Sequence, residues 1–234
     1  MRVLAVEATG SVAGVAVVGA LSPADNPKVF AEFALDCHKK HAQTLLPLVA
    51  SMLETLEMKI SEMDFIACSA GPGSFTGLRI GAATAKGLAH GAGLAIIPVP
   101  TLDALAYQVY GGEGTVVVPI MDARRGQVYG QIFRWAGDRP AAIGPPAAED
   151  IEELLARLDG LGLKAVFTGD GVVPYGDLAI RRGHAVAPLA LNRQRAATVG
   201  ALALGMADQA VHGRDFAPFY LRKTEYKKYV PGTV

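Results

Sequence analysis

Cysteine is scarce in this sequence: Cys37 and Cys68 are the only two among 234 residues. So few cysteines exclude a disulfide-rich secreted scaffold. They favour a reducing compartment, in which both residues act as small buried apolar side chains.

Long apolar runs are also lacking. The run from Val3 to Val6 stops at Glu7 and is too short for the apolar core of a signal peptide. The longest charge-free spans, 8–24 and 87–102, are broken by glycine and proline and are too short for a membrane helix. We therefore expect a cytoplasmic protein with no membrane partner.

Neither sign of charge is in excess, because 22 basic and 22 acidic residues leave a formal net charge of zero. This balance argues against broad, non-specific attraction to nucleic acid, although it permits a local basic patch. The basic and tyrosine-rich stretch YLRKTEYKKY, 220–229, is such a patch. It is interpreted either as a solvated tail or as a segment that contacts RNA phosphates and stacks on bases.

Several motifs of catalytic chemistry are missing. The five histidines form no H-E-x-x-H or H-x-x-x-H pair, so the sequence predicts no metal site. No Gly-Lys-Ser/Thr follows a glycine-rich loop as a P-loop requires, and Ser74 lacks the G-x-S-x-G frame of a nucleophile elbow. We predict no catalytic residue.

What the sequence does contain is an alternation of apolar strands and amphipathic helices, which predicts an α/β fold with mixed sheets. A glycine-rich break at 111–114 divides the chain into two expected domains, 1–111 and 112–234. In the first domain we predict strands at 3–7, 12–18, 28–35, 65–69 and 94–99, and helices at 43–57, 76–90 and about 101–110.

The pattern restarts in the second domain, where the strand 116–121 ends at Asp122 much as the first strand ends at Glu7. We further predict a strand at 127–133, a loop at 138–149, a helix at 151–158, a strand at 165–168 and a helix at 196–211. Two similar halves facing each other place both carboxylates near a common cleft. This arrangement is similar to the actin, sugar-kinase and Hsp70 architecture.

Carboxylates at such a cleft suit a hydrated Mg²⁺ ion. Gly169 and Gly171, in the sequence FTGDGV, follow a short strand and have the small size needed to approach an adenine ring. The alternatives are that Glu7 and Asp122 simply face solvent at the strand ends, and that the two glycines form a plain turn.

The stretch SAGPGSFTGLRIGAATAKGLAHG, 69–91, is rich in glycine. Ser74 or Thr76 can cap the helix and leave free N–H groups for an anion. Within the helix, each glycine costs about 1 kcal/mol relative to alanine. That cost favours close packing against another element over phosphate binding.

Five segments occur in the order of one known family: HAQTLLP; GPGSFTGLRIG with the following KGLA; PTLDALA; DARRGQVY; and FYLR. Together they span 41–222, and in them the chain resembles the TsaB (YeaZ) family. The resemblance implies a two-lobed actin-like (ASKHA) fold with a reduced second lobe. It also implies a non-catalytic dimerisation subunit of the complex that forms N6-threonylcarbamoyladenosine at position 37 of tRNAs reading A-starting codons.

The same resemblance implies the partners. These are the catalytic subunit TsaD as a heterodimer, the ATPase TsaE, tRNA through the complex, and a second copy of the chain when it is alone. No cofactor is expected on the isolated chain, and ATP or ADP only in the assembled complex. The chain lacks the H-x-x-x-H pair that TsaD carries after the equivalent of the strand 96–99, and Glu7-Ala8 replaces the usual Asp-Thr of the first turn.

In this family the helices equivalent to 43–57 and 76–90 pair with the same helices of a partner. The residues this implies as a candidate partner interface are Leu45, Leu46, Val49, Met52, Leu53, Gly77, Gly81, Thr84, Ala85 and Leu88. Glu7, Asp122, Gly169 and Gly171 then form a vestigial nucleotide cleft. The alternative functions are an actin-fold phosphotransferase that uses this cleft and, less favoured, a metallopeptidase.

Overall fold

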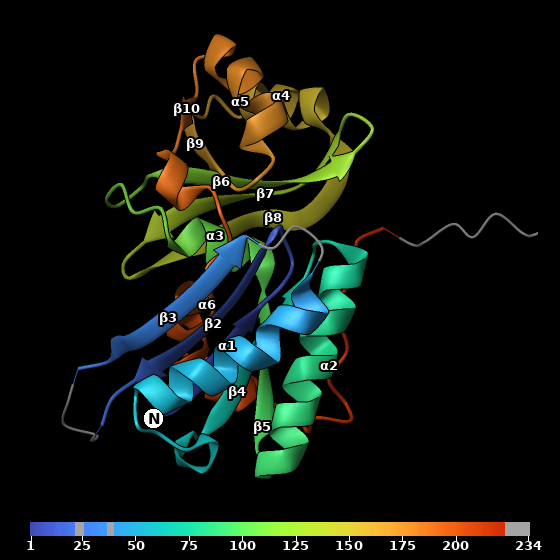
Figure 1. Ribbon diagram of the computed structural model, residues 1–234. Helices are drawn as coiled ribbons and strands as arrows, with labels where there is room; N and C mark the ends of the chain where they lie inside the picture. Colours follow the sequence, from blue (N-terminus) through green and yellow to red (C-terminus); the bar gives the residue numbers. More distant parts are fainter. Residues whose placement is uncertain (22–25, 37–39, 223–234) are drawn as a thin grey trace, which may run out of the picture.

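The computed structural model describes residues 1–21, 26–36 and 40–222. Two lobes are stacked one above the other, and each is built around a five-stranded mixed sheet (Figure 1). Cys37 and most of the basic stretch, 223–229, lie outside the described residues.

The first sheet has the order β3-β2-β1-β4-β5. Its strands are β1 (Arg2–Glu7), β2 (Val12–Gly19), β3 (Lys28–Asp36), β4 (Phe65–Gly71) and β5 (Ala95–Pro100). The central strand β1 pairs antiparallel with β2 and parallel with β4. It is apolar at consecutive positions because helices cover both of its faces, with Leu4 and Val6 on one side and Val3 and Ala5 on the other.

Two long helices, α1 (His41–Thr55) and α2 (Phe75–Ala92), cover one face of this sheet and pack against each other (Figure 1). Ser74 caps α2, since its hydroxyl accepts the Gly77 N–H at 3.4 Å. The helix ends at Gly93, whose φ of +69° is the left-handed conformation that glycine adopts without strain.

The second sheet repeats the first, with the order β8-β7-β6-β9-β10. Its strands are β6 (Val116–Arg124), β7 (Gln127–Ala136), β8 (Arg139–Asp150), β9 (Ala165–Thr168) and β10 (Ala185–Val186). The helices α4 (Ile151–Gly160) and α5 (Val172–Arg181) take the places of α1 and α2. The predicted repeat of the strand pattern in the two halves is therefore confirmed, although β6 continues past Asp122 to Arg124 whereas β1 ends at Glu7.

The second lobe is reduced in its helices and in its last two strands, while β6, β7 and β8 are longer than β1, β2 and β3. Its helices α4 and α5 have 10 residues each, against 15 and 18 in α1 and α2, and β10 has only 2. The described residues also include the short 3₁₀ helices η1 (Ile60–Glu62), η2 (Leu189–Leu191) and η3 (Ala207–Gln209).

Two helices pack against the lobe other than the one whose strands precede them in the chain. The helix α3 (Thr101–Tyr107) follows β5 but packs its Leu102 and Leu105 against Val117 and Met121 of the second sheet. The helix α6 (Ala196–Ala203) follows the second sheet but packs on the first, where the side chain of Val18 lies too close to Gly200 for any Cβ.

The predicted second domain, 112–234, is therefore wrong in its C-terminal part. From α6 onward, residues 196–220 pack on the first lobe, and Arg222 reaches back to the second. Val211 and Ile96 exchange backbone hydrogen bonds of 2.8 and 2.9 Å, and the Phe219 N–H donates to the Ala70 carbonyl at 2.6 Å. A sequence boundary at a glycine-rich break cannot reveal a segment that returns later.

Two predicted elements also differ. The proline-rich stretch 138–149, predicted as a loop, is the edge strand β8, whose Pro145 and Pro146 fall where the register with β7 shifts. An edge strand tolerates proline at such a bulge because no ladder hydrogen bond is lost there. The predicted helix 196–211 ends at Ala203, and Gly205 follows. The helix α5 was not predicted.

No helix among the described residues is both long and apolar enough to cross a membrane.

Candidate functional site: the interlobe cleft and the α1–α2 surface

A cleft of about 730 Å³ lies between the lobes. The first lobe contributes the turn after β1, the start of α1 and the start of α2, and the second lobe contributes the end of β6 and the turn after β9. The lining includes Thr9, Gly10, Ser11, His41, Ser74, Phe75, Thr76, Gly77, Asp122, Arg124, Tyr129 and Asp170.

Glu7 is not among the residues that line this cleft. Its side chain is fully buried beneath the turn. One carboxylate oxygen accepts the N–H and hydroxyl of Thr9 at 2.5 and 2.6 Å, and the other accepts the hydroxyl of Ser69. Burial raises the pKa of Glu7, and these hydrogen bonds oppose the shift. The chain's own donors thus occupy three of the lone pairs of this carboxylate, and burial separates it from the cleft.

Asp122 does line the cleft, but its charge is already paired. Its carboxylate accepts the Arg124 N–H at 2.8 Å and forms an ion pair of 3.0 Å with the Arg124 guanidinium. Because Glu7 does not reach the cleft, the predicted pair of Glu7 and Asp122 does not form a magnesium–nucleotide site there; the Arg124 side chain that faces Asp122 is 85% exposed. Arg124 is part of the site that the sequence interpretation missed, although it stands within the quoted segment DARRGQVY.

Gly169 and Gly171 pack against their own chain. A Cβ on Gly169 would lie 2.2 Å from the Ile120 carbonyl oxygen, and one on Gly171 would lie 2.9 Å from it. Both glycines thus let the turn after β9 close over the end of β6, and the Gly171 N–H donates to Ile120 at 3.0 Å. This contact explains them without a bound adenine and favours the plain-turn interpretation.

Asp170, between these glycines, is the second residue of the cleft that was missed. Its carboxylate accepts the Asp122 N–H at 3.2 Å and so joins β6 to the turn after β9. Burial is the largest cause that raises its pKa, and the Asp122 hydrogen bond opposes it. The signal was present in the sequence, since Asp170 stands between the two glycines that were singled out.

The glycines at the start of α2 also serve close packing, as the sequence favoured. A Cβ on Gly77 would lie 2.0 Å from the Ala8 carbonyl oxygen, and one on Gly81 would lie 3.3 Å from the Ala8 Cβ. The element they approach is the turn after β1 of the same chain. These two glycines therefore do not face a partner.

The ten candidate interface residues divide into two groups by burial. The core of the first lobe contains Leu45, Val49, Met52, Gly77, Gly81 and Ala85. Their assignment to a partner surface is corrected, because the amphipathic stripe that periodicity detects is the one facing the chain's own sheet. The other four remain at the surface: Leu46 is 53% exposed, and Leu53, Thr84 and Leu88 are half-buried.

The outer surface of the two helices carries other small residues beside these four. Ala50 on α1 and Ala83 and Gly87 on α2 are exposed, and a Cβ on Gly87 would meet nothing within 4 Å. We call the residues Leu46, Ala50, Leu53, Ala83, Thr84, Gly87 and Leu88 the α1–α2 surface. Among the described residues, no contact explains a helical glycine at position 87.

The described end of the chain joins three of the quoted segments. Tyr220 packs on Phe75 at the start of α2, with ring centroids 5.4 Å apart. Arg222 donates to the Ala123 carbonyl at 3.1 Å and also contacts Gln127, so it bridges to the second lobe. Within the described chain, the segment FYLR therefore contacts both lobes and links them.

Within residues 1–21, 26–36 and 40–222, no three His, Cys, Asp or Glu side chains come together as a metal-binding group.

Comparison with known sequences gives a consistent result. A sequence model of the family described as TsaD, tRNA N6-adenosine threonylcarbamoyltransferase, matches residues 35–225. The tRNA threonylcarbamoyladenosine biosynthesis protein TsaB of Escherichia coli (strain K12) is 32% identical over 245 aligned residues, covering 99% of this chain and 99% of that protein. The Bacillus subtilis (strain 168) protein of the same name is 33% identical and covers 58% of this chain and 56% of its own length.

Among solved structures, YeaZ from Pseudomonas aeruginosa superposes with a TM-score of 0.77 at 25% sequence identity. The superposition covers 94% of this chain and 99% of that one, so both lobes and the returning C-terminal segment are shared. The fold is the two-lobed actin-like fold with mixed sheets that the sequence predicted. On full-length sequence similarity and shared fold, this chain belongs to the TsaB (YeaZ) family.

Proposed function

We propose that this chain is a non-catalytic scaffold in tRNA threonylcarbamoyladenosine biosynthesis, which binds and activates the catalytic subunit TsaD with TsaE as ATPase. A relative named for this pathway that matches over its full length, and a second that matches over about half of its length, support the pathway assignment. The buried Glu7 supports the non-catalytic role, because its carboxylate is hydrogen-bonded within the chain and does not line the cleft.

The observation that carries the proposal is the α1–α2 surface. Leu46 is about half exposed, and the small residues Ala50, Ala83 and Gly87 of the same two packed helices are exposed as well. Small residues let a second pair of helices approach closely, while leucine contributes apolar area. A standard interface buries about 800 Å² on each partner, so the partner would contact both helices rather than one.

The same surface accounts for Gly87. A glycine inside an exposed helix costs about 1 kcal/mol relative to alanine. Nothing within 4 Å of its missing Cβ compensates that cost in the isolated chain. Close approach of a partner helix is the compensation we propose. A second copy of the chain would occupy this surface when TsaD is absent.

The test is a tRNA modification assay with cognate TsaD, TsaE, ATP, threonylcarbamoyl-AMP and unmodified tRNA, with and without this chain. We expect modification only when the chain is present. Gly87→Leu places a bulky side chain on the α1–α2 surface and is expected to reduce TsaD binding at least tenfold in titration calorimetry. Gly160→Leu is the matched control, because Gly160 is also a helical glycine with nothing within 4 Å and lies in α4 of the other lobe.

Equal TsaD binding by the two variants would remove the α1–α2 surface from the proposal. Modification that is unaffected by the wild-type chain would reject the scaffold role itself. Magnesium-ATP hydrolysis by the isolated chain would instead favour the phosphotransferase alternative.

A further inference from the structure

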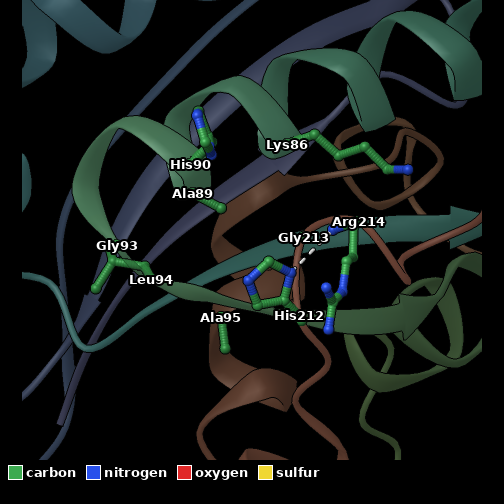
Figure 2. A pocket seen from close by; sticks show the side chains of 9 residues that line it. All are labelled: Lys86, Ala89, His90, Gly93, Leu94, Ala95, His212, Gly213 and Arg214. Atoms are coloured by element: carbon green, nitrogen blue, oxygen red, sulfur yellow. Dashed lines mark hydrogen bonds between the residues drawn. The ribbon is translucent and has the colours of Figure 1, made fainter.

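A second pocket, of about 510 Å³, lies at the opposite end of α2 from the interlobe cleft. Figure 2 shows it between the last turns of α2 and the segment 212–214, which returns to this place after the second lobe. Its lining residues are Lys86, Ala89, His90, Gly93, Leu94, Ala95, His212, Gly213 and Arg214. No function described above uses this pocket.

Every ionisable side chain that lines the pocket is basic. Lys86 and His90 come from α2, above the pocket in Figure 2, and His212 and Arg214 come from the segment below it. This is a local departure from a chain whose formal net charge is zero. The side chains of Lys86 and His90 have no hydrogen-bond or ion-pair partner anywhere in the described part of the chain.

The backbone of the segment 212–214 is fixed by hydrogen bonds and by burial of a neighbouring side chain. Val211 is paired with Ile96 of β5, and the Asp215 and Phe216 N–H groups donate to the His212 carbonyl at 2.9 and 3.2 Å. Phe216 is 2% exposed and fixes this turn in the core of the first lobe. The basic groups are therefore presented by a preorganised backbone, which lowers the entropy cost of binding.

The side chains that line the pocket suit an anionic ligand rather than a cation. The Nδ1 atom of His212 accepts the Arg214 N–H at 3.3 Å, so in the neutral ring the proton is on Nε2, which is a donor. A metal ion is disfavoured because Lys86 and Arg214 bring positive charge to the two imidazoles. The ion pair at the rim between Arg214 and Asp215, at 3.6 Å, joins two side chains that are 79% and 62% exposed and is readily exchanged.

The end of α2 carries negative partial charge, which opposes an anion. His90 lies in the last turn of the helix, and Lys86 lies one turn before it, so their charges act against this potential. An anion that accepts hydrogen bonds from both walls of the pocket is therefore favoured, even though the negative partial charge at the end of α2 opposes it.

We propose that this pocket binds the phosphodiester backbone of RNA. Lys86 and Arg214 contact the phosphates, while His212 donates a further hydrogen bond. The choice of RNA among polyanions rests on the proposed function in tRNA modification. The volume supports a backbone segment over a single small anion, because the pocket also has room for the flanking sugars against Ala89, Leu94 and Ala95. Such contacts position the RNA and do not select a sequence.

The experiment measures binding of fluorescently labelled, unmodified tRNA to the full chain by anisotropy at several salt concentrations. Lys86→Gln combined with Arg214→Gln should weaken binding about tenfold and reduce the slope of log K against log salt by about 1.4 to 1.8, for two lost phosphate contacts. The control double variant, Lys28→Gln with Arg139→Gln, removes the same charge from β3 and β8, and we expect its affinity within about twofold of wild type.

Thermal unfolding of both double variants shows whether they are folded. The proposal is overturned if the two folded double variants bind tRNA with equal affinity. It is also overturned if the wild-type chain does not bind tRNA at 50 mM salt. Polyglutamate is the competitor: displacement of tRNA by polyglutamate at equal charge concentration would assign the pocket to an acidic protein segment instead.

The modification assay separates this proposal from the proposed function. If the Lys86/Arg214 variant binds tRNA like wild type and supports full modification, the pocket assignment fails and the scaffold role stands. If tRNA binding depends on the pocket while the wild-type chain does not promote modification, the scaffold role fails and the RNA site stands.

Discussion

The hydroxyl of Ser69 donates a hydrogen bond to the carboxylate of Glu7, which joins the ends of two neighbouring parallel strands, β4 and β1, beneath the interlobe cleft. Thr9 satisfies the other carboxylate oxygen. A carboxylate that reaches neither solvent nor the cleft is a structural group, and its hydrogen bonds fix the turn on which α2 packs.

Glu7→Ala should destabilise the chain by about 2–4 kcal/mol, because the buried donors of Thr9 and Ser69 lose their acceptor. Glu7→Gln keeps the shape and one acceptor, so it should cost about 1 kcal/mol. Urea unfolding measures both. Loss of tRNA modification with Glu7→Gln at unchanged stability would contradict the structural role and place Glu7 in the chemistry.

Gly77 and Gly87 stand in the same helix but should respond oppositely to alanine. Gly77→Ala should destabilise by about 2–4 kcal/mol because the new Cβ overlaps the Ala8 carbonyl. Gly87→Ala should stabilise by about 0.5–1 kcal/mol through helix propensity. Thermal unfolding of the two variants measures this. A destabilising Gly87→Ala would show that position 87 packs within the chain.

Gly169→Ala should destabilise by about 2–4 kcal/mol. Its φ of +98° strains any side chain, and its Cβ would collide with the Ile120 carbonyl oxygen. Gly160→Ala in α4 is the control and should be neutral or slightly stabilising. If Gly169→Ala folded with normal stability and lost only nucleotide binding, the adenine-contact interpretation of this turn would be restored.

Asp103 gives the protein a pH-dependent stability. Burial raises its pKa from 3.8 to about 6, so the folded chain holds the proton more tightly than the unfolded chain. This contribution is full below about pH 4 and is lost as the pH rises through 6. Asp103→Asn should therefore raise stability at pH 7.5, by about 3 kcal/mol at most, and by much less at pH 4. Equal gains at both pH values in urea unfolding would refute the shift.

Much of the secondary structure was predictable because its cause is local. The apolar run before Glu7 predicted a central buried strand, and the match of Asp122 to Glu7 predicted the repeated sheet. β8 was missed because an edge strand tolerates prolines that composition assigns to a loop. α6 was overextended because alanine-rich sequence continues past the point at which the chain turns toward β5.

The sequence by itself determined the fold class, the repeat of the two halves and the family, because hydrophobic periodicity and ordered motifs survive without knowledge of contacts. Only the tertiary structure decided which side chains are available. It buried Glu7, paired Asp122 with Arg124, and placed Leu45 in the core while leaving Leu46 exposed. It also brought Arg214 beside α2, more than a hundred residues away in the chain. The physical reason is that burial and charge pairing depend on which elements meet in space, and periodicity reports only that an element has an apolar side.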